Sequence, residues 1–211
     1  MAIVVALCIS IPIGVLSAIR QDTLKDYAAR SAAIIGLSVP QFWKATLVIV
    51  LPSIWFGWAP PLQFTPFSEN PWQHLSQFIL PAIILGIAPG ASLMRLTRAL
   101  MLEVLRQDYI RTAWSKGMRE PRVVLRHALK NAIIPVVTLL GLQIINIANG
   151  TVILETIFGL PGVGRFLVDA MFQRDYTVVQ GVILFTSSII VVVNLLVDMT
   201  YAYLDPRIRY Q

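Results

Sequence analysis

The chain has 211 residues, of which 56% are hydrophobic and 13% are charged, and its net charge at pH 7 is +6. Soluble domains carry about 25% charged residues, so this composition excludes an ordinary water-soluble domain and indicates a membrane protein. The basic residues are concentrated between apolar stretches, which argues against a nucleic-acid-binding surface. The single cysteine, Cys8, can form no internal disulfide and is too little for a metal site.

The apolar stretches predict the fold class. A membrane-spanning helix needs about 20 mostly apolar residues. The sequence therefore predicts an all-α integral membrane protein in which residues 1–211 form a single transmembrane domain with about five spans, at about 1–19, 31–57, 78–98, 132–154 and 177–203. The first stretch has no basic start and no small-residue cleavage site, so we interpret it as a membrane helix and not as a signal peptide.

The connections between the spans predict the orientation. Residues 95–131 hold nine Lys and Arg and three Asp and Glu, so their net charge of +6 equals that of the whole chain. Residues 58–77 hold four prolines and no Lys or Arg, which predicts an irregular loop. The positive-inside rule then places 20–30, 99–131 and the C-terminus in the cytoplasm, and 58–77 and 155–176 outside. The start of the chain would lie outside as well, so we expect the chain to be the later part of a longer protein.

The basic segment 99–131 has a helical pattern of its own. Helix-forming residues continue up to Gly117, which can adopt the left-handed conformation that ends a helix. A second helix is expected to begin near Pro121, because proline is favoured in a first turn. The pattern predicts two helices joined by a turn at the cytoplasmic surface, followed by a span that begins near Asn131.

Motifs in and after this segment resemble a known family. The segment contains Arg111-Thr112-Ala113, three further residues and Gly117, and later Arg126-His127-Ala128-Leu129-Lys130-Asn131-Ala132-Ile133-Ile134-Pro135. Phe158-Gly159-Leu160-Pro161-Gly162-Val163-Gly164, Arg174-Asp175-Tyr176 and the ending Asp205-Pro206-Arg207-Ile208-Arg209-Tyr210 follow in order. In these motifs the chain resembles the permease subunits of binding-protein-dependent ABC importers, in the dipeptide/oligopeptide/nickel branch. Two departures from the general pattern are Arg111, where the family has an acidic residue, and Lys130, where it has a proline.

The resemblance implies a type I ABC importer (MetI-like) fold of six helices, of which this chain lacks the first and the segment after it. It implies a short cytoplasmic coupling helix, at roughly 105–120, that docks in a groove on an ATPase subunit. The implied coupling residues are Tyr109, Arg111, Thr112, Ala113, Lys116, Gly117 and Arg119, and the residues at the start of the following helix are His127, Asn131 and Pro135. The basic side chains could equally fix topology and contact lipid head groups.

The same resemblance implies the partners and the activity. These are a second homologous permease, two cytoplasmic ABC ATPase subunits, a periplasmic or lipid-anchored substrate-binding protein and the lipid of a prokaryotic inner membrane. The chain itself would be no enzyme and would bind no cofactor, because ATP would be bound and hydrolysed on the ATPase subunits. We expect the substrates to be di- or oligopeptides, with nickel or glutathione as alternatives in the same branch. An alternative of another class is an ion-coupled secondary transporter, although no internal repeat supports it.

Polar residues inside the spans are candidates for the translocation path. Gln143, Asn146 and Gly150 share one helix face, with Asn149 close by. Asp198 and Asn194 share a face of the last span, where a buried acid is costly. Hydrogen bonds between helices are the alternative role for both sets.

The glycine-rich motif 159–164 is similar in spacing to a phosphate-binding loop, but it lacks the Gly-Lys-Ser/Thr ending and follows no strand. We expect it to form an ordered outer loop. His, Cys and acidic residues show no metal-ligand spacing, so no metal site is expected.

Overall fold

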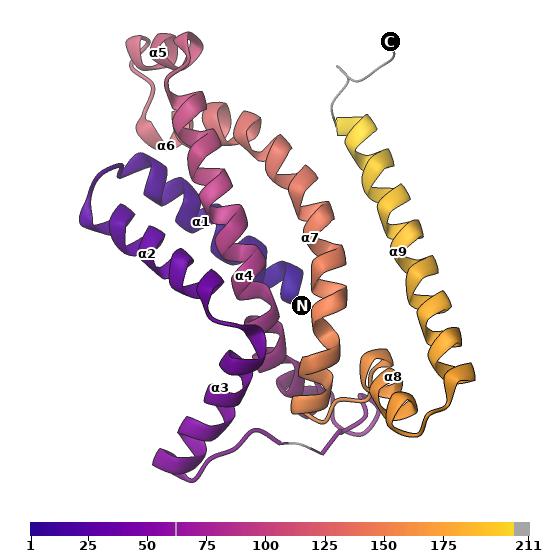
Figure 1. Cartoon of the computed structure of the whole chain (residues 1–211). Coiled ribbons are helices and arrows are strands. Elements are labelled where there is room, and N and C mark those ends of the chain that lie inside the picture. The colour runs from indigo at the N-terminus through magenta and orange to yellow at the C-terminus, as the bar shows by residue number, and fades with distance from the viewer. Residues whose placement is uncertain (62, 205–211) are drawn as a thin grey trace. The chain divides into compact units, whose positions relative to one another are not determined.

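The computed structural model of the chain describes the backbone of residues 1–61 and 63–204 and most of their side chains, those of 145, 146, 148–150, 198 and 200–204 excepted. Its elements are helical (Figure 1): α1 (Ala2–Ile19), α2 (Leu24–Ser38), α3 (Gln41–Phe56), α4 (Pro71–Leu105), α5 (Asp108–Ser115), α6 (Glu120–Arg122), the π-helix η1 (Val123–Ala128), α7 (Leu129–Ile157), α8 (Val163–Phe172) and α9 (Tyr176–Leu204). Over these described ranges there is no strand, and the all-α prediction is confirmed.

Four helical segments are long and apolar enough to cross a membrane, namely Ala2–Ile19, Pro71–Leu105, Glu120–Ile144 and Tyr176–Val197. A fifth crossing is obtained if the bent pair of α2 and α3 is counted as one span. These counts rest on length and composition over the described residues. The number and position of the spans, and the single transmembrane domain, stay predictions.

The stretch 31–57, which the sequence predicts to be one span, contains a break between two helices. Helix α2 ends at Ser38, α3 begins at Gln41, and the two are bent by 99° at the break. Pro40 causes the break, because its nitrogen has no hydrogen to donate and its ring drives the preceding residue out of the helical conformation. The backbone of Pro40 is accordingly extended, with φ −60° and ψ 148°.

The proline-containing loop before α4 is irregular, as predicted, and is bound to the helix that follows it. Gln77 Nε2 donates to the Gln63 carbonyl at 2.7 Å, and Gln77 Oε1 accepts from the Thr65 amide at 3.2 Å. The ring of His74 lies 2.9 Å from the Thr65 carbonyl through Nδ1. One turn earlier, Asn70 Oδ1 accepts the Gln73 amide at 3.1 Å and caps α4.

The helix that was expected to begin near Asn131 begins earlier. Helices α6, η1 and α7 follow one another without a break from Glu120 to Ile157. The second helix therefore starts beside Pro121, as the sequence predicts, and simply does not stop before the apolar stretch. Pro135 lies inside α7, where it removes one backbone hydrogen bond and leaves the Asn131 carbonyl without its helical donor.

The described residues divide into two compact units, each assembled from several segments of chain. The first comprises Met1–Val5, Val39–Gly86 and Ile144–Leu196. Its apolar core is formed by Ala2, Ala45, Ile84, Leu85, Ile147, Leu154, Phe158 and Leu160. The second comprises Ala6–Ser38, Ile87–Gln143 and the described residues 197–204.

In the second unit α1 and α4 pack at very short range. A Cβ on Gly14 would lie 2.8 Å from Thr97 Cβ and 2.9 Å from the Met94 carbonyl oxygen, and one on Gly90 would lie 3.2 Å from the Ala6 Cα. Contacts this short leave no room for a side chain. Small residues at such crossings bring helix backbones together in an apolar solvent, where hydrophobic burial supplies little driving force.

We expect G14A to destabilise the protein by about 1–3 kcal/mol, since the added methyl group must displace Thr97 or the α4 backbone. The matched control is G181A in α9, where a Cβ meets nothing within 4 Å and alanine favours the helix by up to about 1 kcal/mol. Thermal unfolding in detergent, followed by circular dichroism, measures both. Equal stability of the two variants would contradict the close packing of α1 on α4.

Candidate functional site

The basic segment 99–131 contains the short helix α5, which lies between α4 and α6 in the second unit. Its eight residues run from Asp108 to Ser115, after an extended residue at Gln107 (φ −71°, ψ 150°) that separates it from α4. Ile110 and Ala113 are three positions apart, so they lie on one face, and they are 0% and 7% exposed. The remaining positions of α5 are exposed. The helix is therefore amphipathic and has one buried face.

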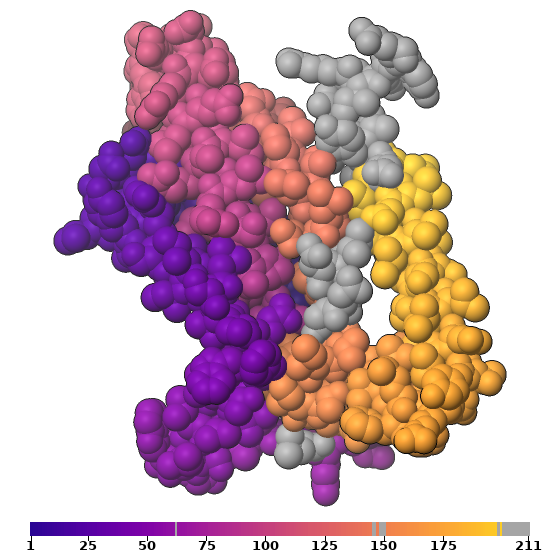
Figure 2. All heavy atoms as spheres, in the orientation of Figure 1, coloured from indigo at the N-terminus to yellow at the C-terminus, as the bar shows by residue number. Residues whose placement is uncertain are grey.

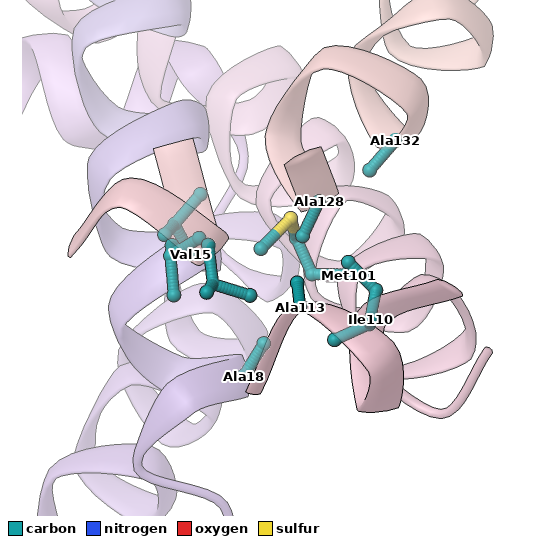
Figure 3. Packing of buried hydrophobic residues seen from close by; sticks show 9 residues of the cluster. Val15, Ala18, Met101, Ile110, Ala113, Ala128 and Ala132 are labelled. Atoms are coloured by element: carbon teal, nitrogen blue, oxygen red, sulfur yellow. The ribbon is translucent and has the colours of Figure 1, made fainter. Parts of the chain in front are cut away.

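The buried face of α5 fits into an apolar cluster drawn from distant parts of the sequence. Figure 3 shows Ile110 and Ala113 converging with Val15 and Ala18 of α1, Met101 of α4 and Ala128 at the end of η1. Val123, Val124 and Ala132 complete the cluster. We call these nine residues the seating cluster. It fixes α5 against α1, α4 and the start of α7.

The opposite face of α5 is open to solvent and combines aromatic with charged groups. Tyr109 and Trp114 are both 43% exposed, and Arg111, Lys116 and Arg119 are exposed as well. The surface of this segment, pink in Figure 2, is uncovered on the face shown. On this face Arg111 pairs with Asp108 at 3.5 Å, but both side chains are highly exposed, so the pair holds Arg111 only weakly.

Of the residues that the resemblance implies for coupling, Ala113 differs from the others in its surroundings. Its side chain lies in the seating cluster and faces away from solvent. Thr112 Oγ1 donates to the Asp108 carbonyl at 3.0 Å within the same helix. A partner that approaches α5 would therefore meet Tyr109, Arg111, Thr112 and Lys116, which are exposed, and not the side chain of Ala113.

Gly117 ends α5 in the way that the sequence predicts. Its φ is +72°, and its amide donates to the Trp114 carbonyl at 2.9 Å while the Met118 amide donates to the Ala113 carbonyl at 3.3 Å. These two bonds form a Schellman motif, in which glycine takes the left-handed position without steric cost. A Cβ on Gly117 would meet nothing within 4 Å, so the open space beside this turn is available to a partner.

The residues implied for the start of the next helix are bound to α5 through one tyrosine. Asn131 Nδ2 donates to Tyr109 Oη at 2.8 Å and to the His127 carbonyl at 3.2 Å. His127 contributes its backbone to this contact, and Pro135 lies one turn further along α7. The hydrogen bonds join the first turn of α5 to the point where η1 passes into α7.

The structure describes the side chains of only some of the candidates for the translocation path. Gln143 and Asn194 are half-buried. The side chains of Asn146, Asn149 and Asp198 lie outside the described residues, as does the motif 205–210 at the chain end. The four path residues Gln143, Asn146, Asn149 and Asp198 stay predictions.

The glycine-rich loop in the first unit surrounds a carboxylate. Glu155, near the end of α7, accepts the Arg165 amide at 3.0 Å through Oε2, and Arg165 is the third residue of α8. A Cβ on Gly162 would overlap the Glu155 carboxylate, and one on Gly164 would lie 2.6 Å from the Val152 Cα. The glycines therefore make room for Glu155, which caps α8 in place of a phosphate.

A buried ion pair in the second unit was missed by the sequence analysis. Asp26 of α2 is 0% exposed and binds Arg98 of α4, with Nη2 to Oδ2 at 2.7 Å. In the sequence the two residues fall in the charged segments 20–30 and 95–131, where charge by itself indicates only the orientation of the chain. An acid at the third position of a helix with an apolar second half is only a weak sign of a buried ion pair. Its partner lies 72 residues away, so no local sequence pattern links the two residues.

Solved structures share this arrangement of helices. The chain matches a chain of "Inward facing conformations of the MetNI methionine ABC transporter: CY5 native crystal form" with a TM-score of 0.71, over 97% of this chain and 89% of the other, at 14% sequence identity. The fold is therefore that of the MetI-type ABC transporter permeases, which confirms the predicted fold class.

Sequence comparison then gives the family. Residues 10–210 match the family described as "Binding-protein-dependent transport system inner membrane component". The chain belongs to this family of transport permeases, as its motifs had indicated, and it is a component of an inner membrane.

Two curated relatives illustrate the similarity. The chain is 44% identical to the "Oligopeptide transport system permease protein AppB" of Bacillus subtilis, over 98% of this chain and 66% of the relative. It is 41% identical to the "Dipeptide transport system permease protein DppB" of Escherichia coli, over 100% of this chain and 69% of the relative. The chain thus spans about two thirds of the length of the relatives it matches.

We expect G117L to abolish transport while leaving insertion intact. The left-handed backbone costs any other residue about 1–2 kcal/mol, and the open space beside Gly117 means that leucine clashes with nothing in its own chain. Uptake by membrane vesicles and the amount of protein in the membrane are measured together.

The matched control for that variant is G57L, because Gly57 also has a positive φ (63°) and also meets nothing within 4 Å. Both variants carry the same backbone strain. If G57L and G117L lose transport equally, strain and not a docked partner explains the effect at Gly117.

We expect G162A to destabilise the glycine-rich loop by about 1 kcal/mol, because the new methyl group displaces the Glu155 carboxylate and breaks its hydrogen bond with the Arg165 amide. In the E155A background the same substitution should cost much less, since the obstacle is gone. A double-mutant cycle of thermal stability in detergent measures the coupling. Additive effects of the two substitutions would show that Glu155 does not occupy the space beside Gly162.

Proposed function

We propose that the chain is the permease subunit of an ATP-driven importer for di- and oligopeptides, and that α5 couples it to a separate ATPase. One observation carries the proposal: the buried face of α5 packs on the seating cluster, while its aromatic and cationic face is exposed. A surface helix held in this way can receive a displacement from a partner and pass it to the helices beneath it.

The chemistry of the exposed face supports an acidic, concave partner surface. Tyr109 and Trp114 offer the rigid contact area that is enriched at binding hot spots. Arg111, Lys116 and Arg119 supply positive charge around them, and Gly117 lets a partner come close to the backbone. ATP would be bound and hydrolysed on that partner, and this chain would contribute no catalytic group.

The positive charge of 95–131 supports a cytoplasmic position for α5 and, with the alternation of spans, for the C-terminus. In this arrangement a second homologous permease, two ATPase subunits and an external substrate-binding protein complete the transporter. Over Tyr176–Val197, α9 is almost wholly unburied within the described part of the chain, with Val182 as the buried exception, which supports a helix that contacts lipid or the second permease.

The peptide substrate is supported by the relatives, whose names specify dipeptide and oligopeptide transport. A peptide backbone needs hydrogen-bond donors and acceptors along its path. Gln143, Asn146, Asn149 and Asp198 would supply them from α7 and α9.

The test is recovery of the ATPase subunits with the tagged permease from solubilised membranes. Truncation of a hot-spot tryptophan costs about 2 kcal/mol or more, which is roughly a 30-fold loss of affinity, so W114A should bring down little ATPase. W72A is the matched control, since Trp72 is 83% exposed at the start of α4, far along the chain from α5.

Recovery of ATPase by W114A at the level of the unaltered protein would rule out docking through α5. A permease that is stable in the membrane but brings down no ATPase under any condition would contradict the importer function itself. Uptake of labelled peptide by vesicles that contain the complete transporter tests the substrate.

A further inference from the structure

The ion pair between Asp26 and Arg98 joins α2 to α4 in the second unit. Arg98 donates twice, from Nε to Oδ1 at 2.8 Å and from Nη2 to Oδ2 at 2.7 Å. Such two-pronged pairs between arginine and a carboxylate define direction as well as distance. The Asp26 side chain is fully buried, and that of Arg98 is 18% exposed.

Two further donors complete the surroundings of the Asp26 carboxylate. Ser17 Oγ of α1 donates to Oδ1, and the Asp22 amide donates to Oδ2 at 3.1 Å. Asp22 lies in the turn between α1 and α2 and has a positive φ of 60°, which is uncommon outside glycine. One carboxylate therefore connects α1, the turn after it, α2 and α4.

A buried ion pair of this kind is a poor means of gaining stability alone. Removing two charges from water offsets most of their attraction, and apolar residues of similar volume often stabilise a protein as well or better. What apolar residues cannot supply is the direction of four hydrogen bonds. The arrangement therefore points to control of helix register more than to adhesion between helices.

The register that Asp26 fixes is that of the surface beneath α5. Ser17 immediately precedes Ala18, and Arg98 lies one helical turn before Met101. Ala18 and Met101 are members of the seating cluster, in which they surround Ile110 and Ala113 of α5. A slip of α1 along α4 would move both contacts away from the short helix.

We propose that Asp26, with Arg98 and Ser17, is a positioning site for coupling: it holds α1, α2 and α4 in register, so that a displacement of α5 moves these helices together. The inference rests on the proposed docking of α5 on an ATPase. Without the site, α5 still binds its partner, but its motion is absorbed by slippage of α1 and α4.

The test uses the complete transporter, with its ATPase subunits and binding protein, in proteoliposomes, where uptake of labelled peptide and ATP hydrolysis are measured in the same sample. In D26N the complex should assemble and hydrolyse ATP, while the ATP consumed per peptide rises roughly 2- to 30-fold, the range by which single substitutions change coupling. The control D169N removes a carboxylate from an exposed pair with Arg165 and should leave this ratio unchanged.

A second variant distinguishes a role in helix register from a role in stability. It also tests the proposal if D26N fails to fold. D26L/R98M replaces the ion pair by apolar side chains, which should restore thermal stability but not the direction of the hydrogen bonds. We expect this variant to be stable and still to consume excess ATP per peptide.

A normal ratio of ATP to peptide in D26N, or in a stable D26L/R98M, would overturn the positioning role. A parallel fall of uptake and hydrolysis in both variants would do the same, because it indicates lost protein and not lost coupling. If the unaltered protein shows no ATPase partner or no peptide uptake, the proposed function fails and the inference fails with it.

Discussion

Close contact between α1 and α4 is the constraint on which the second unit depends. Gly14 and Gly90 remove the side chains that would keep the two backbones apart. In a lipid environment helices gain little from burying apolar groups, so short-range packing and hydrogen bonds must hold them together. The same approach brings Ser17 of α1 and Arg98 of α4 to one carboxylate, and it brings Ala18 and Met101 into one apolar cluster. Both the ion pair and the seating cluster follow from it.

The short helix α5 owes its position to that surface. An isolated helix of eight residues is not stable in water, and α5 is retained because Ile110 and Ala113 enter the seating cluster and because Asn131 binds Tyr109. Its outer face is thereby left for a partner. Under the proposed function, in which a separate ATPase drives the permease, a helix fixed on one side and open on the other is suited to receive the displacement of that partner.

In each unit, hydrogen-bond donors of the protein bind a buried or partly buried carboxylate. Asp26 is surrounded by a guanidinium, a hydroxyl and an amide, and Glu155 accepts an amide from the first turn of α8. A charge removed from water is costly unless donors replace the water. The glycines at 162 and 164 meet this need by making room for a carboxylate, which gives a physical reason for a motif whose spacing only superficially matches a phosphate-binding loop.

The sequence by itself determined the features that depend on neighbouring residues. Apolar stretches of sufficient length predicted an all-helical membrane protein, glycine at 117 predicted the end of α5, and proline at 121 predicted the start of the next helix. The motifs from Arg111 to Pro135 indicated the family. Each of these follows from local propensity, from composition or from a linear pattern, and so it can be recognised without knowing where the rest of the chain lies.

Only the tertiary structure decided which distant residues meet. The pairing of Asp26 with Arg98 joins positions 72 residues apart, and the inward orientation of Ala113 depends on the cluster beneath it. The 99° bend at Pro40 divided a stretch whose hydropathy is continuous, because a window of apolar residues cannot distinguish a straight helix from a broken one. These features arise from packing between segments, where each partner is defined by the other, and a linear pattern carries no record of that contact.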